Sequence, residues 1–174
     1  MRPGQALTET SESGSPVRVQ SRAPDRHDGS MGFTAVLPST MEAVEGAARD
    51  FRRLFGVLSR DVAGHADPDP VFSGELLLRE ALLNAVLHGN GSEAQQNVYC
   101  AARVKRGNLL IVVIDQGQGF DWQAAMARDA AAHECTGRGL RIFRMYATRV
   151  RFSARGNRVA LLKRASGDWK REQE

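Results

Sequence analysis

The most constraining feature of the sequence is a run of six large apolar residues, 109–114, that ends directly in Asp115. A continuous apolar run of this length is typical of a strand in the centre of a sheet. A carboxylate at the end of such a strand is costly unless it is paired or faces a ligand. Gly117 and Gly119 follow and permit positive φ and a close approach of the backbone to a flat ring. The D-x-G-x-G pattern therefore indicates either a ligand site or an ordinary Asp-Gly turn.

Hydrophobic periodicity predicts further strands and helices on both sides of this run. The strands are expected at 33–37, 97–105, 109–115, 149–154 and 158–164. The helices are expected from a capping box at Ser39 and Glu42 to near Gly64, from 72 to 88, and from Gly137 or Gly139 to Tyr146. The alanine-rich residues 121–135 have no clear pattern. This order predicts an α/β fold, a two-layer sandwich of a mixed β-sheet covered on one face by about three helices.

The length of 174 residues is sufficient for one domain with its own core. Residues 1–31 are poor in large apolar side chains, so a disordered N-terminal tail is predicted there. The ligand-binding domain is predicted over 32–166, and a charged, frayed end over 167–174. The sequence shows no signal peptide and no apolar stretch of membrane-spanning length. Cys100 and Cys135 lack metal-binding spacing, so a soluble, cytoplasmic protein with reduced thiols is expected.

The net charge of +4 is a mild surplus of 24 basic over 20 acidic residues. The arginines are scattered along the chain, and few aromatic residues are present to stack on bases. Direct binding to nucleic acid or to a membrane is therefore not expected.

A second candidate motif lies on the predicted helix 72–88. Glu80, Asn84 and His88 are four residues apart, so they share one helical face, which is also the pattern of a solvated stripe. The other residues between Glu80 and His88 are Ala, Leu or Val, so Asn84 is expected near the core, where an amide needs partners. Its oxygen suits Mg²⁺, and Glu80 is placed to accept a proton from an attacking hydroxyl group or water. His88 has the position of a packing or capping residue and is kept as a candidate ligand contact.

A third candidate motif is the segment Thr136-Gly137-Arg138-Gly139-Leu140, which opens the last predicted helix. Glycines at a helix N-terminus leave backbone N–H groups available, and the helix dipole favours an anion there. Arg138 adds a positive charge, so the segment indicates a phosphate site or, read alone, a flexible loop.

At the first motif, the carboxylate of Asp115 can accept a hydrogen bond from the exocyclic amino group of adenine. Guanine presents a carbonyl oxygen at that position, which a carboxylate repels.

Together, and in this order, the three motifs resemble the ATP-binding superfamily of gyrase, Hsp90-type chaperones, histidine kinases and mismatch-repair ATPases, which share the Bergerat fold. The segment 80–90, EALLNAVLHGN, looks like the N box of that superfamily. DQGQGF and TGRGL look like its two glycine boxes. Within the superfamily the chain is most similar to the small anti-sigma-factor serine kinases of bacterial partner-switching systems.

The resemblance implies a set of roles for residues of this chain. Asn84 would hold Mg²⁺, Glu80 would act as the base, Asp115 would read adenine, and residues 121–136 would form a mobile lid. The nucleotide would be lined by the remaining candidates, which are His88, Gly117, Gly119, Thr136, Gly137, Arg138, Gly139 and Leu140. The implied reaction transfers the γ-phosphoryl group of ATP to a serine of an anti-anti-sigma antagonist. The implied second activity sequesters a sigma factor and so regulates transcription, commonly as a homodimer.

Two departures from the family pattern leave alternatives open. Many relatives carry an Arg just before the second glycine box, where this chain has Cys135, and a Thr on the final strand, where 156–160 has none. Both positions lie near the nucleotide in those relatives, and poor positioning of phosphates costs rate. A regulatory switch that binds ATP and protein partners without catalysis is one alternative, and a histidine-kinase-like ATPase module is the other.

Overall fold

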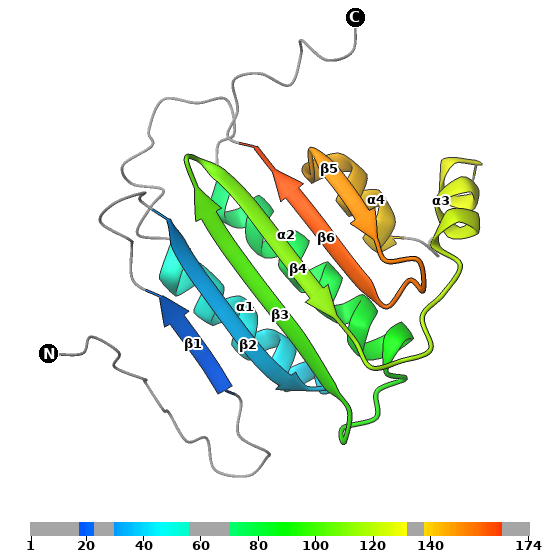
Figure 1. The fold of residues 1–174 in the computed structure, drawn as a ribbon, viewed down its shortest axis with the longest axis horizontal. Helices are drawn as coiled ribbons and strands as arrows, with labels where there is room; N and C mark the ends of the chain where they lie inside the picture. The colour runs from blue at the N-terminus through cyan, green and yellow to red at the C-terminus, as the bar shows by residue number, and fades with distance from the viewer. Residues whose placement is uncertain (1–17, 23–29, 56–69, 132–137, 165–174) are drawn as a thin grey trace, which may run out of the picture.

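One antiparallel β-sheet organises the chain in the computed structural model, which describes residues 18–22, 30–55, 70–131 and 138–164. Across this part the strand order is β1-β2-β3-β4-β6-β5 (Figure 1). The strands are β1 Arg18–Arg22, β2 Met31–Pro38, β3 Asn97–Lys105, β4 Asn108–Ile114, β5 Arg149–Phe152 and β6 Arg158–Lys163. The helices are α1 Met41–Phe55, α2 Pro70–Leu83, the π-helix η2 Asn84–Gly89, α3 Trp122–Ala131 and α4 Arg138–Tyr146.

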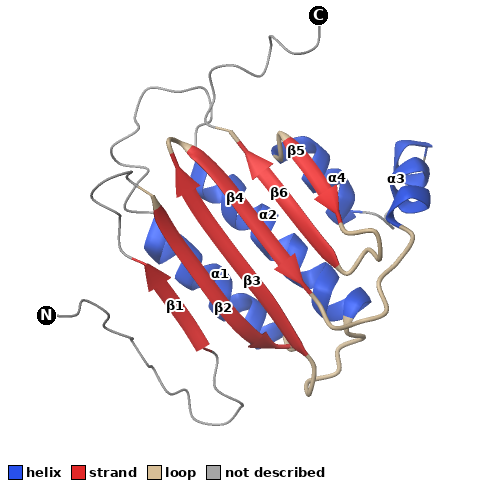
Figure 2. Cartoon of the chain, viewed as in Figure 1, coloured by secondary structure: helices blue, strands red, loops and turns tan. Residues whose placement is uncertain are grey.

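The helices α1, α2 and α4 cover one face of the sheet, whereas α3 lies beyond the β5 edge (Figures 1 and 2). The predicted two-layer α/β sandwich is therefore confirmed. The sheet differs in one respect from the prediction, because every strand pair in the described residues is antiparallel, and the sheet is not mixed. The two helices α1 and α2 lie between β2 and β3 in the chain. Two successive reversals of direction return the chain to the end of the sheet where β2 finished, so β3 runs antiparallel to it.

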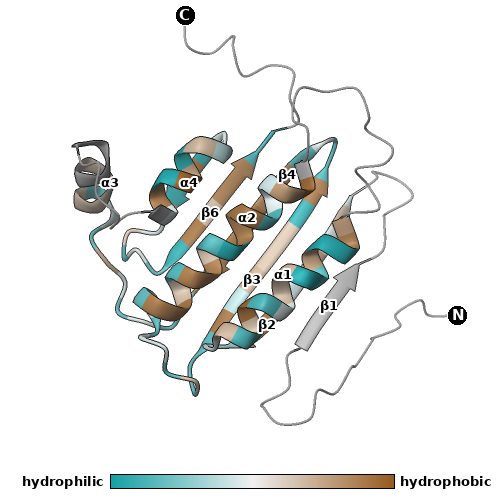
Figure 3. Cartoon of the chain, turned by 180° about the vertical axis from the view of Figure 1, so that it is seen from behind, coloured by the Kyte–Doolittle hydropathy of each residue, from teal (hydrophilic) through white to brown (hydrophobic). Residues whose placement is uncertain are grey.

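The core lies between the sheet and these helices, and α2 is its central member. Ala81 and four nearby residues of α2 are buried, namely Ser73, Leu77, Leu78 and Leu82. Figure 3 shows α2 as mainly hydrophobic along its length, whereas α1 carries more hydrophilic residues on the same side of the molecule. On the sheet, alternate residues face this layer, and they include Phe33, Leu37, Val98, Ile111, Val113 and Leu161. The run 109–114 thus has only one buried face, with Leu109, Ile111 and Val113 pointing into the core.

A buried carboxylate joins α1 to α2. Glu75 is buried, and its Oε2 accepts a hydrogen bond from Nε of Arg52 at 2.5 Å. Its Oε1 lies 3.5 Å from Arg79, which also pairs with Glu45 on α1. A carboxylate in this position is tolerable because two guanidinium groups flank it.

The structure changes several predicted boundaries. Residues 18–22, inside the segment 1–31 for which disorder is predicted, pair with β2 as the edge strand β1. Strand pairing uses backbone groups that polar residues also carry, so a sequence without apolar alternation can form an edge. The alanine-rich segment contains α3, and the helix predicted to end at 88 changes to a π-helix at Asn84. The predicted end of the first helix near Gly64 lies outside the described residues.

None of the helices in the described part of the chain has the length and apolar character needed to cross a membrane.

Candidate functional site

Two of the three predicted motifs meet at the end of β4, and glycines allow their contact. A Cβ atom on Gly89, the last residue of η2, would lie 2.4 Å from Cγ of Asp115. A Cβ atom on Gly117 would lie 1.8 Å from the carbonyl oxygen of Gly89. A larger residue at 117 would clash with the main chain of Gly89, and a larger residue at 89 would displace the carboxyl group of Asp115. The N-box helix and the first glycine segment are therefore packed main chain against main chain.

The second glycine segment contacts Asn84. A Cβ atom on Gly139, in the first turn of α4, would lie 2.7 Å from Nδ2 and 3.1 Å from Oδ1 of Asn84. The N-terminal turn of α4 therefore lies directly over the carboxamide of Asn84. The backbone N–H groups of such a turn and its dipole favour an anion nearby. Leu140, the next residue, packs partly buried against the core.

The helix that carries Glu80, Asn84 and His88 is not regular. It is α-helical to Leu83 and π-helical from Asn84 to Gly89, and the N–H of Asn90 bonds the carbonyl of Ala85, five residues earlier, at 2.8 Å. Single π turns are frequent at functional sites because they shift side chains from the α-helical register. Glu80 and Asn84 are half-buried, whereas His88 is exposed at the end of η2.

The carboxylate of Asp115 is buried, with 9% of the residue exposed. Its Oδ1 accepts a hydrogen bond from the N–H of Gly117 at 2.9 Å. Burial raises the pKa of Asp115 above its ordinary value, while backbone hydrogen bonds and the positive charge of Arg155 lower it in part. The main chain of Asp115 is held by Asn157, because its N–H bonds the carbonyl of Asn157 at 3.0 Å and its own carbonyl accepts from Nδ2 of Asn157 at 3.2 Å.

Asn90 connects the helix end to the sheet, a role that the sequence analysis missed. It is 3% exposed, and its Nδ2 donates to Oγ of Ser39 at 2.6 Å and to the carbonyl of Asn97 at 3.1 Å. Its Oδ1 accepts from the N–H of Gln116 at 2.8 Å. Its local signals are an Asn directly after Gly89 and its place as the last residue of the N-box-like segment 80–90. The partners lie up to 51 residues away, and local patterns do not report them.

Arg155, at the turn between β5 and β6, is a second residue that the sequence analysis missed. Its Nε donates to the carbonyl of Gln118, and a terminal nitrogen donates to Oε1 of the same residue, both at 3.1 Å. Gly119 has φ +79°, and a Cβ atom there would lie 1.9 Å from the carbonyl oxygen of Arg155. The N–H of Phe120 donates to that same carbonyl at 3.1 Å. The hairpin thus contacts the first glycine segment at 118–120, whereas η2 contacts it at Gly117.

Aromatic rings anchor the start of α3. Phe120 and Phe152 meet edge to face at 5.7 Å between ring centroids, and Trp122 stacks on Phe152 at 5.5 Å. The predicted lid, 121–136, thus begins as a helix attached to β5. Thr136 and Gly137 lie outside the described residues, and Arg138 is described only as the first residue of α4.

The family model of the histidine kinase-like ATPase domain matches residues 37–163, which is more than half of the chain. The chain belongs to the histidine kinase-like ATPase domain family. A comparison with curated proteins found no match. The matched span includes all three motifs, from Glu80 to Leu140, so this domain is an ATP-binding, kinase-like ATPase domain.

The arrangement fits such a ligand on two observations. A Cβ atom at position 139 would crowd the carboxamide of Asn84, so the glycine lets the backbone of the α4 N-terminal turn approach this side chain closely. The buried carboxylate of Asp115 accepts one hydrogen bond from Gly117 and retains capacity to accept others, as an adenine amino group requires.

Asn90→Ala should lower the free energy of unfolding by about 2 to 3 kcal/mol, because it leaves the N–H of Gln116 and the carbonyl of Asn97 without their present partner. Urea denaturation followed by circular dichroism measures this loss. The exposed Asn108→Ala is the matched control and should change stability by less than about 0.5 kcal/mol. Equal losses in the two variants would refute the role assigned to Asn90.

Arg155→Gln should raise the pKa of Asp115 further, because it removes a positive charge that favours the carboxylate. Arg155→Lys retains the charge and should raise this pKa less. NMR titration of the Asp115 side-chain carbon measures both values. If the two variants raise the pKa equally, the geometry of the loop rather than the charge of Arg155 controls the carboxylate.

Proposed function

We propose that this domain is an ATP-dependent serine protein kinase of a bacterial partner-switching system. Its protein substrate would be an anti-anti-sigma antagonist, and its second role would be to sequester a sigma factor. The observation that supports nucleotide chemistry is the contact of the α4 N-terminus with Asn84, one helical turn after Glu80. The form E-x-x-x-N-A-x-x-H-G-N and the GRGL helix start favour the serine-kinase subtype by resemblance.

Asp115 is proposed to select adenine. Its carboxylate is held by the N–H of Gly117 and by the packing of Gly89, so it presents a fixed acceptor at the end of β4. An exocyclic amino group satisfies that acceptor, whereas the carbonyl oxygen of guanine would face a negative charge without a proton between them. Gly117 and Gly119, which follow Asp115 in the same loop, would lie beside the base.

The start of α4 is proposed to bind the phosphates. Gly137, Arg138 and Gly139 would supply main-chain N–H groups and one positive charge to the β- and γ-phosphates. Thr136 and Leu140 flank this turn, and His88 is exposed at the nearby helix end. The carboxamide oxygen of Asn84 would ligate Mg²⁺, which supplies neutralisation of the phosphate charge when bound.

Glu80 is proposed as the base. It lies on α2 one turn before Asn84 and is half-buried. In the transfer step the serine oxygen of the substrate forms a bond to the γ-phosphorus, the bond from that phosphorus to the bridging oxygen of ADP breaks, and the serine proton passes to the carboxylate of Glu80. ADP leaves with its bridging oxygen as an additional phosphate oxygen.

A second candidate function is a switch that binds ATP and protein partners without transfer. Two departures from the family pattern favour it. The stretch 156–160 contains no Thr, which many relatives have on the final strand, and Cys135 stands where many relatives have an Arg. Neither departure affects Asp115 or Asn84, so both readings share the same binding site. Under either reading the domain is expected to act as a homodimer in the cytoplasm and to bind neither nucleic acid nor membrane directly. A histidine-kinase-like ATPase module remains the third reading.

Calorimetric titration with Mg²⁺ present should give tighter binding of ATP than of GTP. Asp115→Asn should weaken ATP binding at least about tenfold, because a charged acceptor is lost. Affinity of the wild type should also fall as the pH falls through the raised pKa of Asp115, since protonation removes the acceptor. Protonation of the nucleotide affects its binding to the wild type and to Asp115→Asn alike. The difference between the pH dependences of the two affinities therefore reports on Asp115.

The stability of Asp115→Asn is the control for folding. An Asn oxygen still accepts from the N–H of Gly117, and the buried charge is removed. The pKa of Asp115 is higher in the folded state than in the unfolded chain, where it is about 3.9. Ionisation of Asp115 therefore lowers the free energy of unfolding at a pH above the folded-state pKa. At a pH below about 3.9 the group is protonated in both states, and its ionisation has no effect. The variant should therefore be no less stable than the wild type at pH 7. Unchanged selectivity for adenine in this folded variant would refute the role of Asp115.

Glu80→Gln should retain ATP affinity and lower phosphoryl transfer to a serine-bearing antagonist by at least about a hundredfold, because it removes the base. Transfer of radiolabelled phosphate measures the rate, and calorimetry measures the affinity. The exposed Glu42→Gln on α1 is the matched control. Full transfer by Glu80→Gln would exclude Glu80 as the base, and ATP binding without transfer in the wild type would favour the non-catalytic switch.

A further inference from the structure

The peptide group that joins Asp115 to Gln116 is held at both ends by asparagine side chains. Its carbonyl oxygen accepts a hydrogen bond from Nδ2 of Asn157 at 3.2 Å. Its N–H donates to Oδ1 of Asn90 at 2.8 Å. The carbonyl and the N–H of a trans peptide point to opposite sides, so the two asparagines hold this group from opposite directions. We call Asn90 and Asn157 the asparagine clamp.

The two members of the clamp come from the two layers of the fold. Asn90 is buried directly after the last residue of η2, and it is itself held by Ser39 and by the carbonyl of Asn97. Asn157 is partly exposed and directly precedes β6. The peptide after Asp115 is therefore tied to both layers, and a rotation of this peptide would lengthen both hydrogen bonds.

Asn157 also extends the β4–β6 ladder beyond its last backbone pair, which joins Ile114 to Arg158. One residue further along, the N–H of Asp115 donates to the carbonyl of Asn157 at 3.0 Å. In a regular antiparallel pair the return bond comes from a backbone N–H, whereas here it comes from the side-chain amide of Asn157. The return bond therefore depends on the identity of residue 157, which a backbone bond would not.

An Asn that follows a Gly in a hairpin is also a common turn residue, and that role would need no contact with Asp115. The backbone bonds of this turn come from other groups. The N–H of Ser153 donates to the carbonyl of Arg158 at 2.9 Å, and the N–H of Gly156 donates to the carbonyl of Ser153 at 3.0 Å. The amide nitrogen of Asn157 takes part in neither bond, because it donates to Asp115.

Ser153 sets the orientation of the Asn157 amide. Its hydroxyl donates to Oδ1 of Asn157 at 3.2 Å, and its Oγ accepts from the N–H of Gly156 at 3.2 Å. The carbonyl of Asp115 can only accept, so the nitrogen of the amide faces it and the oxygen faces Ser153. Both ends of the amide thus have a suitable partner, and its donor stays directed at Asp115.

We propose that Asn157 is a positioning residue for base recognition, which holds Asp115 so that its carboxylate faces the amino group of adenine. Asn157 acts through Asp115 and needs no contact with the nucleotide. The N–H and the carbonyl of Asp115 both bond Asn157, so these contacts set the direction in which its side chain leaves the backbone. This inference rests on the proposed selection of adenine by Asp115.

The direction of the carboxylate matters because hydrogen bonds weaken steeply when donor and acceptor are poorly aligned. A displacement of about 1 Å in a binding or catalytic group can cost up to roughly a hundredfold in rate. Asp115 is buried and cannot find water as an alternative partner without a movement of the loop. A peptide that is free to rotate would therefore weaken the contact with adenine more than the contacts with the phosphates.

The test measures the affinities of the full chain for ATP and for GTP by calorimetry with Mg²⁺ present. Both nucleotides carry the same triphosphate, so the ratio of the two affinities reports on recognition of the base. Asn157→Ala should lower the preference for ATP over GTP about tenfold, because the carboxylate loses its fixed direction. Asn157→Asp keeps the size of the side chain and an acceptor for Ser153 but removes the donor, so it should lower the preference as much.

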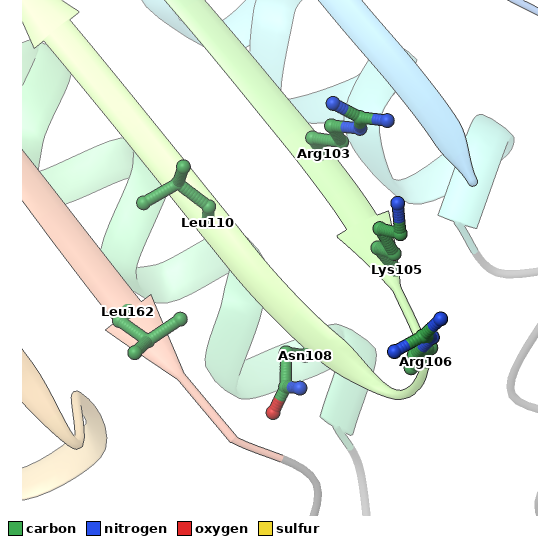
Figure 4. Close-up of a pocket in the computed structure, with 6 residues that line it drawn as sticks. All are labelled: Arg103, Lys105, Arg106, Asn108, Leu110 and Leu162. Atoms are coloured by element: carbon green, nitrogen blue, oxygen red, sulfur yellow. The ribbon is translucent and has the colours of Figure 1, made fainter. Parts of the chain in front are cut away.

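Asn108 provides the matched control. It is exposed at the opposite end of β4 from Asp115, where it lines a hollow of about 330 Å³ together with Leu110 and Leu162 (Figure 4). Asn108→Ala removes the same side chain as Asn157→Ala and should leave the preference for ATP within about twofold of the wild-type value. Equal losses of preference in the two variants would overturn the assignment to the clamp.

A second measurement separates positioning from a loss of stability. Burial raises the pKa of Asp115, and the hydrogen bond from the N–H of Gly117 lowers it in part. This bond is made within the loop that the clamp holds, so Asn157→Ala should raise the pKa of Asp115 further. NMR titration of the Asp115 side-chain carbon measures it without nucleotide. A variant that is only less stable keeps the wild-type pKa while it is folded, and that result in Asn157→Ala would overturn the positioning role.

The binding results distinguish failure of this inference from failure of the proposed function. A wild-type chain that binds ATP and GTP equally would refute the selection of adenine by Asp115 and, with it, the use of the clamp. A preference for ATP that is retained in folded Asn157→Ala and Asn157→Asp would refute the role of Asn157 alone. Thermal unfolding well above the temperature of the titrations shows that each compared variant is folded.

Discussion

The candidate site depends on one close contact between backbones, where the end of η2 meets the loop after β4. The carbonyl of Gly89 lies where a side chain on Gly117 would begin, and Gly89 itself lies against the carboxyl group of Asp115. The position of this carboxylate is therefore fixed by a helix from the other layer as well as by its own strand. Asn90 adds hydrogen bonds to the same junction, to Ser39 and to the backbone of Gln116.

The remaining parts of the site attach to this junction from two sides. The turn between β5 and β6 reaches it through Arg155 and Asn157, and α4 reaches it through Gly139. In each of these contacts at least one of the two residues contributes backbone atoms. Close approach of backbone explains why glycines recur at these positions. A carboxylate that is costly to bury is retained in a place where the surrounding main chain has little freedom to move away from it.

The sequence was most informative where chemistry and spacing combine locally. Asp115 after an apolar run, the glycines that follow it, and Asn84 inside an apolar helix indicated the site, because each is an unusual residue for its local structure. Asn90 and Arg155 were missed because each role depends on at least one partner 26 to 51 residues away. The π turn at Asn84 was missed because apolar periodicity does not distinguish a single π turn from a continued α-helix. The edge strand β1 was missed because its pairing with β2 needs no apolar pattern.

The strand order has a consequence for the timing of synthesis. The strand β4 is bordered by β6, whose residues 158–163 are the last described strand in the chain, and the loop at Asp115 is held by Asn157 and Arg155. While the ribosome is still translating residues 120–150, β4 has an unpaired edge and its carboxylate loop has no hairpin to hold it. The nascent domain is thus without a formed ligand site until nearly all of the matched family span has emerged. A chaperone that protects exposed strand edges would have its longest opportunity to act during that interval.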